Sequence, residues 1–226
     1  MFVAAWSKFL ILVIASIMLI NMYLIFSVAP TEQVMGNIQR LFYLHVPVVL
    51  TSFISFFCSA IFSALYLSRK KYFWDRLAYA SAETGLVFFT GAIITGAVWA
   101  KPVWNTWWVW DANGTLTFVL WMIFIGYLMV REYAPSIEIG RKWGSAVSIL
   151  GAATVPFVYM AADWWGGLHP ERVTGPGADG SLERSMLFIM LFSFACFLLL
   201  FAYLLVERYK QRQIEDTIVR INQIYL

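Results

Sequence analysis

The chain alternates long apolar stretches with short polar connections. Six stretches are long enough, or nearly so, to cross a bilayer, which takes about 17 to 25 helical residues. They are Phe9–Ala29, Val46–Leu67, Thr84–Ala100, Gly114–Val130, Gly144–Ala162 and Met186–Val206. Because lipid cannot satisfy backbone polar groups, each stretch should be an α-helix. The pattern predicts an all-α integral membrane protein, with residues 1–206 forming one six-transmembrane-helix bundle.

Composition agrees with a membrane protein. Of the 226 residues, 61% are hydrophobic and 13% are charged, against roughly 45 to 50% and 25% in soluble domains. The first stretch resembles a secretion signal, because Lys8 precedes it and it ends in Ser-Val-Ala. It is longer than the apolar part of a signal, about 7 to 15 residues, and Pro30 follows it. We therefore interpret it as a retained first helix.

The basic residues predict how the bundle is oriented. With the N-terminus inside the cell, 12 lysines and arginines face the cytoplasm and 4 face outward, namely Arg40, Lys101, Arg172 and Arg184. This asymmetry follows the positive-inside rule and predicts that both termini are cytoplasmic. Acidic residues divide almost evenly between the two sides, so the formal net charge of +3 indicates no nucleic-acid partner.

Tryptophan is concentrated on the predicted outer face. Five indoles occur within twelve residues of "WAKPVWNTWWVWD", and two more end the fifth stretch. These seven are Trp99, Trp104, Trp107, Trp108, Trp110, Trp164 and Trp165. One interpretation is the aromatic belt found at membrane interfaces. The other is a platform for a flat ligand, because a belt should populate both interfaces and many helix ends.

Both histidines of the chain belong to the same face. Pro47 suits the first turn of a helix, which places His45 at or just before the start of the second span. Pro170 and two preceding glycines place His169 in an irregular loop after the fifth span. Zinc normally requires three or four protein ligands, whereas haem iron requires only one or two. Two imidazoles beside many indoles therefore indicate a haem site.

The cysteines and outer charges refine this hypothesis. Cys58 and Cys196 lie inside spans, and no CxxC motif occurs, which excludes a thiol oxidoreductase of that pattern and a c-type haem acceptor. Asp111 is a candidate N-cap of the fourth helix. The haem propionates would need cationic partners, and the outer-face candidates are Arg40, Lys101 and Arg184, with Arg40 the best placed. Each of the three also suits the role of a waterside anchor.

Three segments resemble one known family. "WAKPVWNTWWVWD" is similar to the WWD signature of haem-handling proteins of cytochrome c maturation, and "RLFYLHVP" and "DWWGGLHP" resemble the flanking segments of the CcmC family. The resemblance implies a plasma (inner) membrane protein that presents haem b on the periplasmic face and delivers it to the haem chaperone CcmE. It also implies the partners CcmA and CcmB, which are subunits of an ABC-type complex, and CcmD, besides membrane lipid.

The resemblance also implies a set of site residues. The WWD loop, from Trp99 to Asp111, would contact haem together with the Trp164-Trp165 pair, and His45 and His169 would be its axial ligands. Departures from the family pattern are Ala100 and Asn105, where glycine is common, and a missing arginine after Asp111. The sequence Asn113-Gly114 in its place predicts a tight turn.

Two alternatives belong to other functional classes. A haem-attachment synthase of the same superfamily would carry further histidines within its spans, and this chain has none to spare. A haem permease subunit should show charges or broken helices at the middle of the membrane. Only Asn21 and Pro156 lie well inside spans, and Glu83 lies near an inner end. No residue is a clear acid, base or nucleophile, so haem presentation and transfer fit better than independent catalysis.

The last segment, 207–226, is predicted to be a cytoplasmic amphipathic tail. Ile214, Ile218, Ile221 and Tyr225 form an apolar stripe on an otherwise polar, basic helix. Such a helix either lies on the inner membrane surface or docks a cytoplasmic ATPase subunit.

Overall fold

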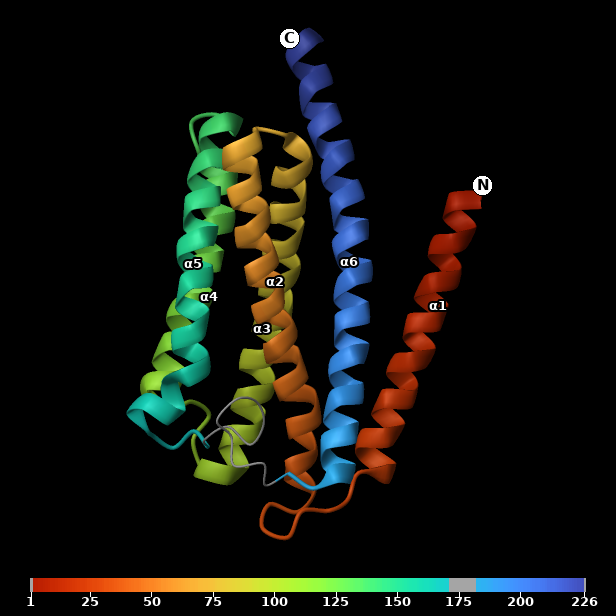
Figure 1. The fold of residues 1–226 in the computed structure, drawn as a ribbon, viewed down its shortest axis with the longest axis vertical. Helices are drawn as coiled ribbons and strands as arrows, with labels where there is room; N and C mark the ends of the chain where they lie inside the picture. Colours follow the sequence, from red (N-terminus) through yellow and green to blue (C-terminus); the bar gives the residue numbers. More distant parts are fainter. Residues whose placement is uncertain (1, 171–181, 226) are drawn as a thin grey trace.

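The structure, a computed structural model, describes residues 2–170 and 182–225. Within these ranges it contains six α-helices and no β-strand. The helices are α1 (Phe2–Tyr23), α2 (Phe42–Arg69), α3 (Tyr72–Trp104), α4 (Ala112–Tyr133), α5 (Ile137–Trp165) and α6 (Arg184–Tyr225) (Figure 1). All six are long and apolar enough to cross a membrane. The predicted six-helix fold is therefore confirmed.

The two ends of the bundle differ in what they carry. Both chain termini lie at one end, which we call the termini end, and the connection between α3 and α4 lies at the other, which we call the tryptophan end (Figure 1). The segment between α1 and α2 is also at the tryptophan end. It contains a π-helix, Leu24–Val28, and a 3-10 helix, Asn37–Leu41. The chain thus crosses the bundle six times, as the sequence predicts.

The helix α2 is the centre of the bundle, because it packs against α3, α5 and α6. Its fully buried serines permit close approach of neighbouring helices, as small residues do in membranes. Ser59 Oγ lies 2.9 Å from the Ala78 carbonyl oxygen of α3 and 2.8 Å from Ser148 Oγ of α5. Nearby, the rings of Phe56 and Phe124 stack with centroids 3.7 Å apart.

The helix α1 joins the bundle mainly through α6. The Ser193 hydroxyl of α6 donates to the side-chain oxygen of Asn21 at 2.7 Å, and both residues are buried. Towards its N-terminus α1 diverges from α6 (Figure 1). The polar residue that the sequence places inside the first span is therefore a helix-pairing contact.

A cluster of buried ion pairs occupies the termini end. Asp75 of α3 accepts two hydrogen bonds from Arg131 of α4, at 2.5 and 2.9 Å, and lies 3.1 Å from Arg141 Nε of α5. Asp216 of α6 pairs with Arg141 at 3.1 Å and with Arg76 of α3 at 2.7 Å. Side chains from four helices are thus joined in one ionic network.

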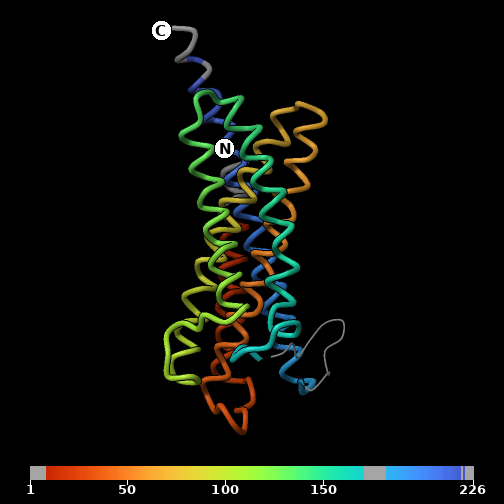
Figure 2. The backbone as a smooth tube through the Cα atoms, turned by 90° about the vertical axis from the view of Figure 1, so that its left-hand side faces the viewer, coloured from red at the N-terminus to blue at the C-terminus, as the bar shows by residue number. Residues whose placement is uncertain are grey.

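The tail is a direct continuation of α6. The helix passes the expected boundary after Val206 without interruption and extends beyond the other helices (Figure 2). Ile214, Ile218 and Ile221 are each about half exposed on it, as the predicted stripe requires. Docking of a partner on this stripe stays a prediction.

Candidate functional site

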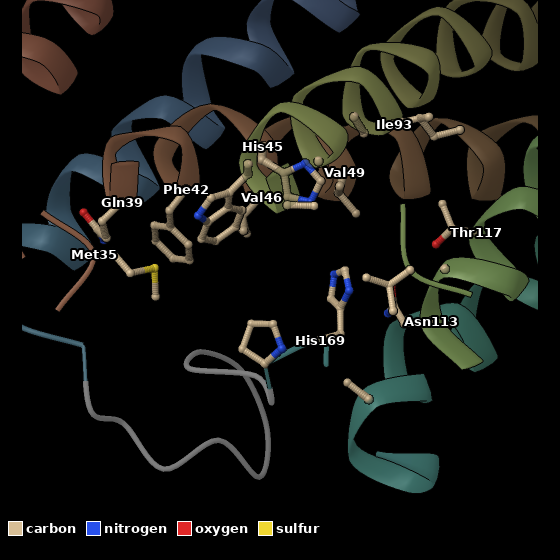
Figure 3. A pocket seen from close by; sticks show the side chains of 18 of the residues that line it. Met35, Gln39, Phe42, His45, Val46, Val49, Ile93, Asn113, Thr117 and His169 are labelled. Atoms are coloured by element: carbon tan, nitrogen blue, oxygen red, sulfur yellow. The ribbon is translucent and has the colours of Figure 1, made fainter. Parts of the chain in front are cut away.

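A cavity of about 640 Å³ lies at the tryptophan end, within the size range of small-molecule sites. Residues of α2, α3, α4 and α5, the start of α6 and the connecting loops line it. Most of the wall is apolar or aromatic. Both histidines of the chain line it as well, and Figure 3 shows their rings on opposite sides of the same open space.

His45 is held by a side chain of the neighbouring helix. Its Nδ1 lies 3.1 Å from the hydroxyl oxygen of Thr95 on α3. That hydroxyl donates its one proton to the carbonyl of Gly91 at 2.9 Å, so it accepts from His45. The proton of a neutral imidazole is then on Nδ1, and the lone pair of Nε2 is left to bind a metal.

The start of α2 differs from the sequence prediction. α2 begins at Phe42, so His45 lies within its first turn and Pro47 lies in the second. His45 was predicted at or just before the start of the span, and it lies at the start, but α2 begins four residues before the predicted Val46. The 3-10 helix Asn37–Leu41 leads directly into α2, and it moves the helix start ahead of the position that the proline indicates.

Gly96 of α3 leaves room for the ring of His45. A Cβ atom at Gly96 of α3 would lie 2.9 Å from Cε1 of the imidazole, closer than real Cβ contacts. Any larger residue would push the ring out of place. Trp99, one turn further along α3, packs edge-on against His45 with ring centroids 5.8 Å apart.

His169 lies in the irregular loop after α5, as predicted. Gly166 and Gly167 both have positive φ, at 66° and 133°, which glycine adopts without strain. They turn the chain back so that the backbone N–H of His169 donates to Asp111 Oδ2 at 3.3 Å. The ring of His169 packs against Trp104 with centroids 5.6 Å apart.

Asp111 serves two segments at once. It is the N-cap of α4, as predicted, and its Oδ1 accepts from the Gly114 N–H at 2.8 Å. Its other oxygen holds the His169 backbone. Burial lowers the pKa of the His169 imidazole below the usual histidine value, and the Asp111 carboxylate opposes that shift. The imidazole is therefore neutral at physiological pH, which is the form that binds metals.

The tryptophans divide into two groups. Trp99, Trp104, Trp107 and Trp108 line the cavity. The indole N–H groups of Trp99 and Trp108 are buried and have no hydrogen-bond partner within the described part of the chain. A buried donor without a partner is rare in proteins, so these two groups indicate a ligand with acceptor atoms.

The other three tryptophans lie outside the cavity wall. Trp110 is 68% exposed and packs edge-on against Phe118. Trp164 and Trp165 are both more than half exposed and pack against each other. The exposure of these three is compatible with an interfacial belt, and the four lining tryptophans are compatible with a platform for a flat ligand. Both interpretations stay predictions.

The three candidate propionate partners do not line the cavity. The guanidinium of Arg40 donates to the Phe26 carbonyl, and the Lys101 ammonium lies 3.1 Å from both the backbone and the side-chain oxygen of Asn105. Arg184 is exposed at the start of α6. Among the described lining residues the charged ones are Glu32 and Glu183.

Sequence reasoning missed several polar residues of the cavity. Gln39 is 6% exposed, and its side-chain oxygen has no partner within the residues described. Asn113 donates to the Val158 carbonyl at 3.2 Å and lies with Gly114 in the first turn of α4. The predicted Asn113-Gly114 tight turn is therefore wrong, because the Asp111 cap starts the helix before it.

Together the fold and the cavity define a six-span membrane protein with two facing histidines in an aromatic pocket at one end. The chain belongs to the CcmC family, heme exporter protein C, whose model matches residues 1–223. It is 29% identical to heme exporter protein C of Escherichia coli K12, over 87% of this chain and 80% of that protein. The Haemophilus influenzae protein of the same name is 28% identical over 83% of this chain and 76% of its own length.

A plant relative extends the comparison. A ccmC-like mitochondrial protein of cytochrome c biosynthesis from Arabidopsis thaliana is 34% identical, over 81% of this chain and 69% of that protein. The chain is thus a multi-pass membrane protein of a family that handles haem in cytochrome c maturation.

Proposed function

We propose that this protein binds haem b in the cavity at the tryptophan end, with His45 and His169 as axial ligands. It then delivers the haem to the chaperone CcmE for the maturation of c-type cytochromes. The observation that carries this proposal is the pair of imidazoles that face each other across one aromatic cavity (Figure 3).

The surroundings of the two histidines suit haem iron. His45 presents Nε2 because its Nδ1–H donates to the Thr95 hydroxyl, and burial keeps His169 neutral. Haem requires only one or two axial ligands from the protein. In the described part of the chain no cluster of three or more His, Cys, Asp or Glu side chains is placed to hold a metal ion by itself, so the donor set fits an iron that brings its own macrocycle.

The cavity wall suits the rest of the haem molecule. Apolar and aromatic side chains cover the ring, and the unpartnered indole N–H groups of Trp99 and Trp108 supply donors for carboxylate oxygens. Arg40, Lys101 and Arg184 stay candidates for propionate contacts. Each lies near the cavity in sequence, and each would have to turn its side chain from its present position.

Delivery requires an open edge of the site. Trp107 lines the cavity and is 60% exposed, and Trp110 beside it is 68% exposed. A chaperone that docks on these two indoles would meet the edge of the bound haem. Haem supplies its own reactive groups, so this protein needs to supply orientation and the exclusion of water.

The partners and location of the protein follow from the same proposal. It acts in the plasma (inner) membrane with CcmA, CcmB and CcmD, and its haem site faces the periplasm. The split of 12 to 4 basic residues supports this orientation, because it puts both termini in the cytoplasm.

An absorption spectrum of the purified protein tests the axial pair. The wild type should show a six-coordinate, low-spin haem, and His45→Ala or His169→Ala should each lose that signature and part of the bound haem. Added imidazole should restore it in part. Trp164→Ala, outside the cavity, is the control and should keep the wild-type spectrum. An unchanged spectrum in both histidine variants would exclude them as ligands.

A further inference from the structure

A second, smaller cavity of about 320 Å³ lies between α3 and α4. Its wall consists of Thr90 and Ile93 of α3, Phe118 and Trp121 of α4, and Trp108 and Trp110 of the loop between them. The Trp121 Nε1–H donates to the Thr90 hydroxyl at 2.9 Å. The polar atoms of both side chains are therefore engaged, and the wall that remains is apolar.

This cavity adjoins the haem cavity. Ile93 and Trp108 line both of them, so these two side chains form the shared wall. The Trp108 backbone carbonyl accepts from the Thr106 hydroxyl at 3.0 Å, but its indole N–H has no partner among the described residues. The indole packs edge-on against Trp110, with centroids 6.0 Å apart. It can therefore rotate without breaking a hydrogen bond.

The small cavity lies on the lipid side of the bundle. α3 packs mainly against α2, and α4 packs mainly against α5, so α3 and α4 meet over only a short region. Phe118, which lines the small cavity, is 39% exposed. The junction is therefore open towards acyl chains.

Its depth corresponds to one leaflet. Trp121 is nine residues from the start of α4 at Ala112, which is about 14 Å at a rise of about 1.5 Å per residue. The hydrocarbon core is about 30 Å thick. The cavity thus lies within the half of the bilayer at the tryptophan end.

We propose that this cavity is a lateral portal through which haem enters the histidine site from the leaflet at the tryptophan end, with Trp108 as the gate. Haem is an amphipathic disc, so in a membrane its carboxylates stay at the headgroups and its ring lies among the upper acyl chains. A ring at that depth meets the apolar wall between α3 and α4. This inference rests on the proposed haem-binding function.

A removable block at the portal tests the proposal. In a variant that lacks Cys58 and Cys196, Phe118→Cys is alkylated with a bulky maleimide, and the protein is reconstituted in phosphatidylcholine vesicles. Phe118 lines the portal but not the haem cavity. The matched control is Phe157→Cys on α5, because Phe157 is 49% exposed and lines neither cavity. Haem is added to the vesicles, and the low-spin spectrum is followed with time.

If the small cavity is a portal, blocking it should change the rates of haem loading and release but not the final haem occupancy. The adduct at position 118 should slow haem loading several-fold and slow release to empty acceptor vesicles by the same factor, because both directions share one path. The final haem occupancy should stay at the wild-type level. The Phe157→Cys adduct should change neither rate. Trp108→Ala, which removes the gate, should speed both loading and release.

Several results would overturn the portal. Equal rates for the two adducts would exclude passage between α3 and α4, and release of a bound acyl chain at unchanged haem rates would assign the cavity to lipid. A fall in final occupancy with the adduct at position 118 would make the small cavity part of the binding site itself. Absence of histidine-dependent haem in the unmodified protein would refute the proposed function, and the portal with it.

Discussion

At the scale of single residues, the carboxylate of Asp111 joins two parts of the site that are far apart in sequence. One of its oxygens caps α4 at Gly114, and the other accepts from the backbone of His169. A Cβ atom at Gly167 would lie 2.5 Å from that second oxygen, so the loop can approach it only with glycine there. The cap that the sequence predicts is therefore also a support for His169, the proposed iron ligand.

Substitution of Asp111 can separate these two roles. Asn has one acceptor oxygen and an amide donor, so Asp111→Asn should keep the cap and place a donor against the His169 N–H. We expect near wild-type thermal stability with a weakened low-spin haem spectrum. Asp111→Ala should lose both contacts and, in addition, about 1 kcal/mol of stability. A wild-type spectrum in Asp111→Asn would show that the cap is the only role of this residue.

Substitutions of Trp108 and Trp110 should affect haem occupancy and haem transfer differently. Trp108 lines the cavity and Trp110 does not, so Trp108→Ala should lower haem occupancy more than Trp110→Ala. Exposed Trp110 should instead affect transfer, so its loss should reduce covalent haem–chaperone formation further than it reduces occupancy. Phe at either position should be milder than Ala, because it keeps a flat apolar face. The measurement is haem per protein against haem transferred; equal losses of both in Trp110→Ala would contradict the docking role.

The sequence was sufficient to find both histidines and the loop, because rare residue types gathered on one face. It was not sufficient to find Thr95 and Gly96, which hold and fit the ring of His45. Their side chains are ordinary for a membrane helix, and only the packing of α2 against α3 brings them to His45. The preference of proline for the first turn also placed the predicted start of the second helix too late, because Pro47 lies in the second turn of α2.

At the scale of helices, the ionic network explains why the predicted third span started too late. α3 begins at Tyr72, well before the expected Thr84, because Asp75 and Arg76 are paired within the bundle. Hydropathy counts such residues as breaks between spans. Buried charges with partners can continue a helix, but the partners of Asp75 come from α4 and α5 and are not visible along the sequence.

Loss of a member of this ionic network should strongly lower the stability of the protein. Asp75 is 2% exposed and faces two arginines, Arg131 and Arg141. Asp75→Ala would leave the buried Arg131 without its carboxylate partner and leave Arg141 with Asp216, and breaking a buried ion pair typically costs about 3 to 5 kcal/mol. We expect a clear fall in the thermal unfolding midpoint in detergent. Exposed Glu132 of α4 is the control, and Glu132→Ala should leave the midpoint almost unchanged; equal midpoints for the two variants would contradict the role of the network.

At the scale of the whole molecule, the orientation in the membrane rests on charge alone. Val34, in the segment between α1 and α2, is 89% exposed, and Lys71 is exposed at the opposite end. In a variant without Cys58 and Cys196, an impermeant thiol reagent added to intact cells should label Val34→Cys and not Lys71→Cys. The reverse pattern would invert the orientation and move the haem site to the cytoplasm. Labelling at position 172, which lies outside the described residues, would give a second test.

The continuity of α6 has a mechanical consequence. Met186 near its start lines the cavity proposed to bind haem, and Asp216 in its tail is paired with Arg76 of α3 and Arg141 of α5. Thirty residues separate these two positions, or about 45 Å of uninterrupted helix. The helix has no hinge along that length at which a push could be absorbed. A force applied to the tail on one side of the membrane would therefore be transmitted along this stiff helix to the wall of the proposed haem cavity at the other end.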